Sequence, residues 1–170
     1  RISVLFSCLV VLVLIVMGYV ISLSVTHHFE DQDRMALEGK LALVQNILDE
    51  TTNADATETI KVKLADALVG HHELSLKMLT NEGHLVFATH AANFPPALFA
   101  RAKDYAPEQM LPLTSVELQK RQFRAISVKL ASQTTRQQYR VVIAIDVGHH
   151  QVFLDSFRWQ LLVVGSAELV

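Results

Sequence analysis

Residues 139–147 read YRVVIAIDV, the most strand-like stretch of this 170-residue chain. β-Branched and aromatic side chains favour extended backbone because they pack well on a pleated surface. Residues 123–132, FRAISVKLAS, come before it and carry an apolar side chain at every second position from Ile126 to Leu130. The polar segment TTRQQ separates the two stretches, so the pattern predicts two strands joined by a turn.

A second hairpin is predicted nearer the amino terminus. Residues 73–80, ELSLKMLT, alternate in polarity, and one face collects Leu74, Leu76 and Met78. The sequence NEG at 81–83 is typical of a turn, and HLVFAT at 84–89 reads as the returning strand. The chain therefore supplies four strands for a small antiparallel sheet.

Helical patterns flank these strands. One apolar seam recurs at spacings of four, three and four residues: Leu37, Leu41, Val44 and Leu48. The seam suits either a domain core or a helix–helix contact between two copies of the chain. Residues 57–69 predict a second helix that ends at Gly70. The segment 93–112 contains all four prolines and reads as a loop with a short helix over 97–103. An antiparallel sheet flanked by helices is an α+β arrangement.

A charge-free run rich in Val, Leu and Ile covers residues 2–26. A bilayer core of about 30 Å needs roughly 20 apolar residues in a helix. The run exceeds the roughly 7–15 apolar residues of a signal peptide, and no A-x-A cleavage site follows it. We therefore expect residues 1–26 to form a transmembrane helix. Because no Gly or Pro interrupts the chain between Val20 and Gly39, we expect this helix to continue outside the membrane.

A second apolar run, WQLLVVGSAELV, fills residues 159–170 but contains Glu168. It reads either as a last helix packed on the domain or as the truncated start of a second transmembrane helix over 158–170. We adopt the second interpretation, with Arg158 and Trp159 at the membrane interface. Residues 27–157 then form one domain outside the membrane. The sequence is thus expected to be a piece of a longer protein.

Composition excludes several classes of function. A formal net charge of −2 does not favour a nucleic-acid partner. Cys8, the one cysteine, falls in the first apolar run, so the domain has no thiol for a disulfide, a cysteine zinc site or a nucleophile. No phosphate-binding glycine loop, G-x-S-x-G elbow or H-E-x-x-H helix occurs. We expect no catalysis within this chain. Arg1 before the first span favours a domain on the far side of the inner membrane.

Histidine is the unusual residue, since six of the eight histidines form adjacent pairs at 27–28, 71–72 and 149–150. Neighbours on a helix point about 100° apart, so one pair does not chelate a metal alone. His28 and His150 border the two predicted membrane helices, and helices that leave one bilayer side by side bring such positions together. We predict a metal site at His28 and His150, with His27 and His149 as neighbours.

The donor atoms indicate which metal such a site would take. Imidazole suits zinc, copper and nickel, and thioether donors add a preference for Cu(I). With no thiol, and with Met78 and Met110 available, Cu(I) or the similar Ag(I) fits, while zinc stays possible. Phe29 beside His28 would shield a soft ion or present its ring face to it. Surface histidines and pH-sensing histidines remain alternative interpretations.

Plainer interpretations apply to the other polar groups. His84 and His90 flank a strand and are expected to face solvent, and Met78 is expected in the core. The pair at 71–72 is expected to cap the carbonyls of the helix before it. The acidic segment FEDQD at 29–33 is expected to form a solvated face.

Both ends of the chain resemble the heavy-metal sensor histidine kinases, whose best-known members sense copper and silver. The stretches that carry the resemblance are THHFEDQDRMALEGKLALVQNIL at 26–48 and IAIDVGHHQVFLDSFRWQLL at 143–162. Within them, His28-Phe29 precedes acidic residues, and Ile145-Asp146 precedes histidine, Phe-Leu and Phe-Arg. The middle of the chain matches only in the order of its elements, and it lacks the Met- and His-rich loop of some members.

The resemblance implies more than the residues show. It implies a PAS-like periplasmic domain between two membrane helices, with Cu(I) or Ag(I) held by His28, Phe29 and His150. It also implies a homodimeric inner-membrane kinase, with ATP in a cytoplasmic core beyond this chain and a response regulator as partner. The same topology also serves small-molecule sensor domains of chemoreceptors and cyclase-type receptors, and a purely structural membrane anchor is a third possibility.

Overall fold

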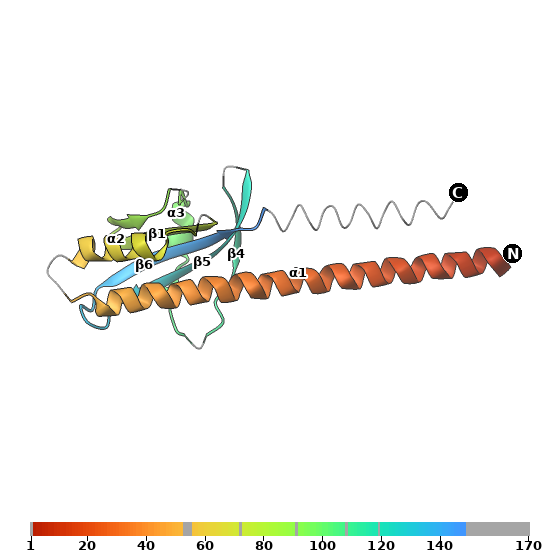
Figure 1. Ribbon diagram of the computed structural model, residues 1–170, viewed down its shortest axis with the longest axis horizontal. Helices are drawn as coiled ribbons and strands as arrows, with labels where there is room; N and C mark the ends of the chain where they lie inside the picture. The colour runs from red at the N-terminus through yellow and green to blue at the C-terminus, as the bar shows by residue number, and fades with distance from the viewer. Residues whose placement is uncertain are drawn as a thin grey trace. The chain divides into compact units, whose positions relative to one another are not determined.

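The computed structural model describes residues 2–52, 56–71, 73–90, 92–107, 109–118 and 120–148 (Figure 1). The chain divides into two units, one of residues 33–147 and one of residues 1–32 with 148–170. The elements, in order, are α1 (Ile2–Glu50), α2 (Ala56–Ala67), β1 (Leu74–Thr80), β2 (Leu85–Ala88), α3 (Pro96–Ala100), β3 (Lys103–Asp104), β4 (Thr114–Leu118), β5 (Arg121–Ala131) and β6 (Gln138–Asp146).

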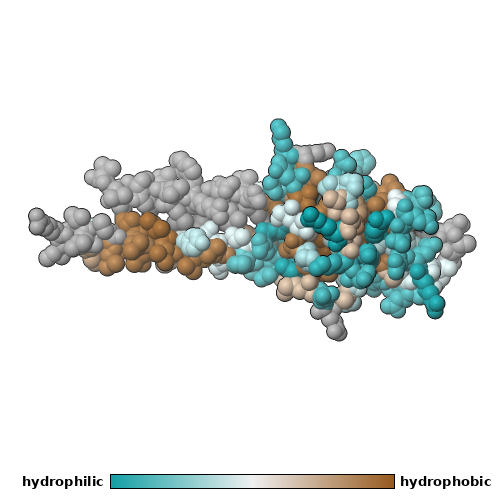
Figure 2. Space-filling model, turned by 180° about the vertical axis from the view of Figure 1, so that it is seen from behind, coloured by the Kyte–Doolittle hydropathy of each residue, from teal (hydrophilic) through white to brown (hydrophobic). Residues whose placement is uncertain are grey.

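Helix α1 is continuous through both units, as the absence of Gly and Pro between Val20 and Gly39 predicted. By length and composition, it includes a segment able to cross a membrane. Its amino-terminal half exposes Val, Leu, Ile and Met side chains and appears as an apolar rod in Figure 2. The expected second span from residue 158 lies outside the described residues.

The strands form one mixed sheet in the order β2-β1-β6-β5-β3, with β4 also paired to β5. The four predicted strands are confirmed as β1, β2, β5 and β6, and the pairs among them are antiparallel. Two strands were not predicted. β4 runs antiparallel to the first half of β5, and the two-residue β3 runs parallel to its second half. The sheet is therefore not purely antiparallel, but the fold is α+β as expected.

The two faces of the sheet bury two separate cores. Because side chains alternate along a strand, even-numbered residues of β5 such as Ile126 and odd-numbered residues of β6 such as Ile143 share one face. Those residues pack with the α1 seam and with Ile60 and Leu64 of α2. Leu37, Leu41, Val44 and Leu48 are all at most 1% exposed, which confirms the core interpretation of the seam.

The opposite face carries the smaller core. Phe123 and Ala125 of β5 and Val142 and Ala144 of β6 pack there against Leu98 and Phe99 of α3. Helix α3 ends at Ala100, before the predicted end at 103, because Lys103–Asp104 is drawn into the sheet as β3. Helix α2 ends at Ala67, and the chain then turns through Gly70, whose φ of +83° favours glycine.

Candidate functional site

The predicted ligands His27, His28 and Phe29 are consecutive residues of α1, roughly two to three turns before its buried seam begins at Leu37. The imidazole of His27 is 77% exposed, and its Nδ1 lies 3.8 Å from Oε2 of Glu30, one turn later. His28 is also exposed. The ring centroids of His28 and Phe29 are 6.5 Å apart, with the planes tilted by 45°. An exposed imidazole beside an aromatic ring leaves a nitrogen lone pair available to a metal ion.

The partners predicted for these residues, His149 and His150, lie outside the described residues. Within the described ranges, no three His, Cys, Asp or Glu side chains are grouped so as to hold a metal ion. The predicted pairing of His28 with His150 stays a prediction.

His84, His90 and Met78 lie as expected, while His72 lies outside the described residues. His84 and His90 are exposed, and Nε2 of His84 lies 3.6 Å from a carboxylate oxygen of Glu82. Met78 is fully buried in the core. The backbone N–H of His71 donates to the carbonyl of Leu68, just past the end of α2, at 3.1 Å, and its ring Nε2 lies 2.9 Å from Nζ of Lys40 on α1.

The acidic segment after the histidines is not simply a solvated face. Asp33 is 3% exposed, and its Oδ2 accepts a hydrogen bond of 2.5 Å from Nη1 of Arg124 on β5. The next residue, Arg34, donates from Nη1 to the carbonyl of Leu111 at 2.6 Å. The expectation was wrong at Asp33 because one side of α1 packs on the sheet, and a carboxylate on that side stays buried only with a cationic partner.

A second ion pair joins β5 to the end of β6. Nη2 of Arg121 contacts Oδ2 of Asp146, whose side chain is 5% exposed. The backbone extends the same junction, since Val147 N–H donates to the carbonyl of Gln122. The strand that leads to His149 and His150, β6, is thus fixed to the start of β5.

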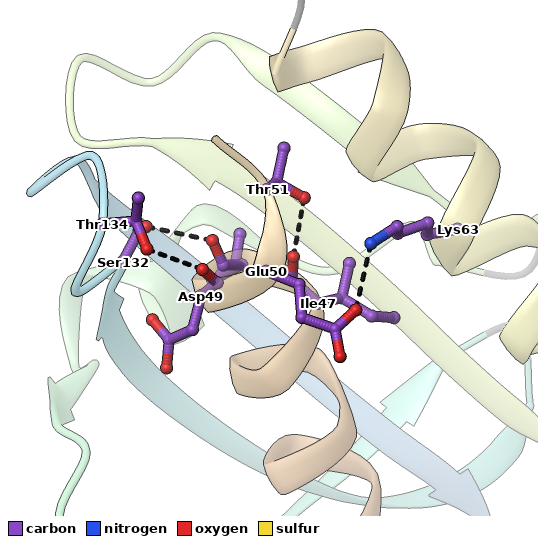
Figure 3. A network of polar contacts seen from close by, with 8 residues as sticks. Ile47, Asp49, Glu50, Thr51, Lys63, Ser132 and Thr134 are labelled. Atoms are coloured by element: carbon purple, nitrogen blue, oxygen red, sulfur yellow. Dashed lines mark hydrogen bonds and ion pairs between the residues drawn. The ribbon is translucent and has the colours of Figure 1, made fainter. Parts of the chain in front are cut away.

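The other end of α1 is fastened to the turn between β5 and β6 (Figure 3). The hydroxyls of Ser132 and Thr134 donate to the carbonyls of Leu48 and Asp49, at 3.0 and 2.6 Å. Thr51 donates to the carbonyl of Ile47 at 2.7 Å. The last carbonyls of a helix have no partner within the helix, so the hairpin turn serves as the cap of α1.

Two open grooves lie on the domain of residues 33–147. One of about 390 Å³ is lined by strand and loop residues that include Tyr105, Lys129 and Gln138, together with Gln45 of α1. Burial, and to a smaller extent the charge of Glu38, raises the pKa of Tyr105 above its usual 10.0. The other groove, of about 490 Å³, lies beside Lys40, His71 and Glu73.

Comparison with known proteins shows that the chain is similar to sensor proteins. The profile of the CusS sensor domain family matches residues 1–154. The probable sensor protein PcoS of Escherichia coli is 25% identical over 163 residues, which make up 92% of this chain and 34% of that protein. Sensor protein CopS of Pseudomonas syringae pv. tomato is 28% identical over 170 residues, or 98% of this chain and 33% of CopS. The chain thus spans about a third of the length of these curated relatives.

A solved structure shares the fold. The crystal structure of the CusS sensor domain with silver bound matches with a TM-score of 0.54 at 15% identity, over 75% of this chain and 97% of that one. The arrangement of helices around a mixed sheet is therefore common to both.

Proposed function

The chain belongs to the CusS sensor domain family, and we propose that it is the periplasmic metal-sensing region of a membrane histidine kinase that responds to Cu(I) or Ag(I). The observation that carries the proposal is the position of His28 and Phe29. Both lie on α1 directly after a segment long and apolar enough to cross a membrane. The silver in the CusS sensor domain, whose fold this chain shares, supports the choice of a soft monovalent ion.

The proposed ligands are His28 and His150, with Phe29 covering the ion and with His27 and His149 as neighbours. Imidazole nitrogens suit copper, and no thiol outside the apolar segment competes with them for the ion. Zinc is the competing ion, because His27 and Glu30 offer a nitrogen and an oxygen within one helical turn.

The proposed topology follows the hydropathy pattern. Residues 1–26 form the first membrane helix, 27–157 the PAS-like periplasmic domain, and 158–170 the start of a second membrane helix in the inner membrane. The longer protein would act as a homodimer, phosphorylate itself with ATP in a cytoplasmic core and pass the phosphoryl group to a response regulator. A ligand shifts a conformational equilibrium only through its different affinities for the two states. An ion bound by both chain ends favours one placement of those ends.

Silver titration of the chain in detergent, in a reducing buffer, tests the proposal. Loss of an outer-sphere partner weakens metal binding roughly 10-fold. Because His28 and His150 are the proposed ligands themselves, we expect His28→Ala with His150→Ala to weaken Ag(I) binding by more than this. His84→Ala with His90→Ala is the matched control, since both histidines are exposed and lie outside the site. Unchanged affinity in the first variant refutes the site, and no Ag(I) or Cu(I) binding by the wild type refutes the function.

A small-molecule sensor is the second candidate, and the groove beside Tyr105 and Lys129 is the observation in its favour. In that case the histidine substitutions leave signalling unchanged. Substitutions that fill the groove, such as Ala131→Leu, then abolish signalling without changing Ag(I) affinity.

A further inference from the structure

Strand β5 begins with two arginines that project to opposite faces of the sheet. Arg121 and Arg124 are three residues apart, and an odd spacing in a strand places side chains on opposite sides. Arg124 reaches Asp33 of α1 on the face of the larger core. Arg121 reaches Asp146 at the end of β6 on the other face. One short segment of β5 therefore bonds both to α1, after its apolar segment, and to β6, the strand that precedes His149 and His150.

Burial makes these contacts sensitive to displacement. The side chain of Asp146 is 5% exposed. That of Asp33 is 4% exposed, so water has little access to its carboxylate if Arg124 moves away. A charge left unpaired in the interior is strongly unfavourable. Ser132 and Thr134 also hold α1 at its far end (Figure 3). The packed half of the helix is therefore fastened at one end to β5 and at the other to the hairpin turn that follows it.

We propose that Asp33, Arg124, Arg121 and Asp146 form a latch, named here the β5 latch, that holds α1 and β6 in one register. In consequence, α1 does not slide over the sheet, and residues 33–147 move as one body. A displacement at His28, five residues before Asp33 on the same helix, is then passed through β5 to the strand that leads to His149 and His150. The signalling consequence rests on the proposed function, whereas the mechanical one does not.

The decisive variant replaces the ion pair by an apolar pair, Asp33→Leu with Arg124→Met, in the full-length protein in membranes. An apolar pair of similar volume keeps a buried site stable but lacks the directional bonds that set a register. We expect the thermal midpoint and Ag(I) affinity to stay near those of the wild type. The ratio of Ag(I)-stimulated to basal autophosphorylation is expected to fall by about fivefold or more. Full stimulation in this variant refutes the latch.

A matched control uses the exposed ion pair between Glu50 of α1 and Lys63 of α2, with N···O at 3.0 Å and side chains 69% and 39% exposed. The corresponding change, Glu50→Leu with Lys63→Met, also removes a contact of α1 but is expected to leave stimulation unchanged. Loss of stimulation in the control as well would show that any weakened contact of α1 suffices, and would overturn the specific role of β5.

A metal-free measurement separates the latch from the proposed function. Spin labels at Met35→Cys and Leu85→Cys, both exposed positions, report the distance between α1 and β2 once Cys8 is changed to serine. We expect one narrow distance distribution with the latch intact and a broad one in the Asp33→Leu, Arg124→Met background. Identical distributions overturn the latch even if the chain binds silver. A broadened one supports it even if the chain binds none.

Discussion

Replacing Asp33 by alanine is the sharpest test of how α1 is held on the sheet. Asp33 stands in the acidic run FEDQD, yet it is 3% exposed and accepts a hydrogen bond of 2.5 Å from Arg124. Alanine removes the carboxylate and leaves the guanidinium of Arg124 beside the core without this partner. If the run were simply a solvated face, the substitution would cost almost nothing.

The expected cost follows from the burial of both partners. Removal of one member of a buried ion pair lowers the free energy of unfolding by about 3–5 kcal/mol. Because 15% of the Arg124 side chain remains exposed, water compensates part of the loss, and we expect about 3 kcal/mol. For a domain of this size, each kcal/mol shifts the melting temperature by roughly 4 °C. The Asp33→Ala chain is therefore expected to melt roughly 12 °C below the wild type.

Differential scanning calorimetry of the detergent-solubilised chain without metal measures this difference. Asp31→Ala is the matched control, because Asp31 lies on the same helix two residues earlier and is exposed. Its effect is expected within about 0.5 kcal/mol. If Asp33→Ala costs no more than Asp31→Ala, the ion pair with Arg124 does not hold α1, and the β5 latch loses its first contact.

Three further outcomes are expected. In a urea titration, Leu41→Ala, at a fully buried position of the seam, should lower the free energy of unfolding by about 2–5 kcal/mol. Val62→Ala, at an exposed position of α2, should change it by less than about 0.5 kcal/mol in the same titration. Ser132→Ala removes the donor to the Leu48 carbonyl and the acceptor for Thr135 N–H, so its free energy of unfolding should fall by about 1–3 kcal/mol in chemical denaturation. Ser115→Ala, at an exposed position, should change the same quantity little. Burial raises the pKa of Tyr139 above 10.0. The contribution of its neutral phenol to stability is therefore present below pH 10 and is lost as the pH rises through the folded-state pKa. Above pH 10, the melting temperature should fall more steeply with pH for the wild type than for Tyr139→Phe, and equal slopes would contradict this.

Much of the fold could be predicted because it depends on local periodicity. The seam from Leu37 to Leu48 follows the helical repeat, and the four predicted strands follow a repeat of two. The continuity of α1 followed from the absence of Gly and Pro near the predicted membrane surface. These patterns need only a few neighbouring residues, so the sequence displays them directly.

The missed strands lacked such a pattern. β4, TSVEL, is five residues long and its side chains are only half-buried or exposed, so it shows little contrast between its faces. β3 has two exposed residues and is extended only because the adjacent edge of β5 offers free backbone partners. Neither strand exists without the neighbour that it pairs with.

The candidate site also has residues that could be predicted from the sequence and residues that could not. His28 and Phe29 could be selected from residue type and from their position after an apolar run, and the structure places both on α1 as expected. Asp33 could not be distinguished from Asp31 by composition, since both stand in one acidic run and only the rotation of the helix against the sheet buries one of them.

The sequence by itself determined the helix that continues from the apolar segment, the α+β class and the place of His27 and His28 on that helix. Each depends on residue types within a few positions of one another. Only the tertiary structure decided what binds α1 to the sheet. Asp33 and Arg124 are 91 residues apart, and Leu48 and Ser132 are 84 apart. Such pairs meet only once the strands have paired in their final register. Each polar group then requires its partner because it is buried, not because the two are close in the chain.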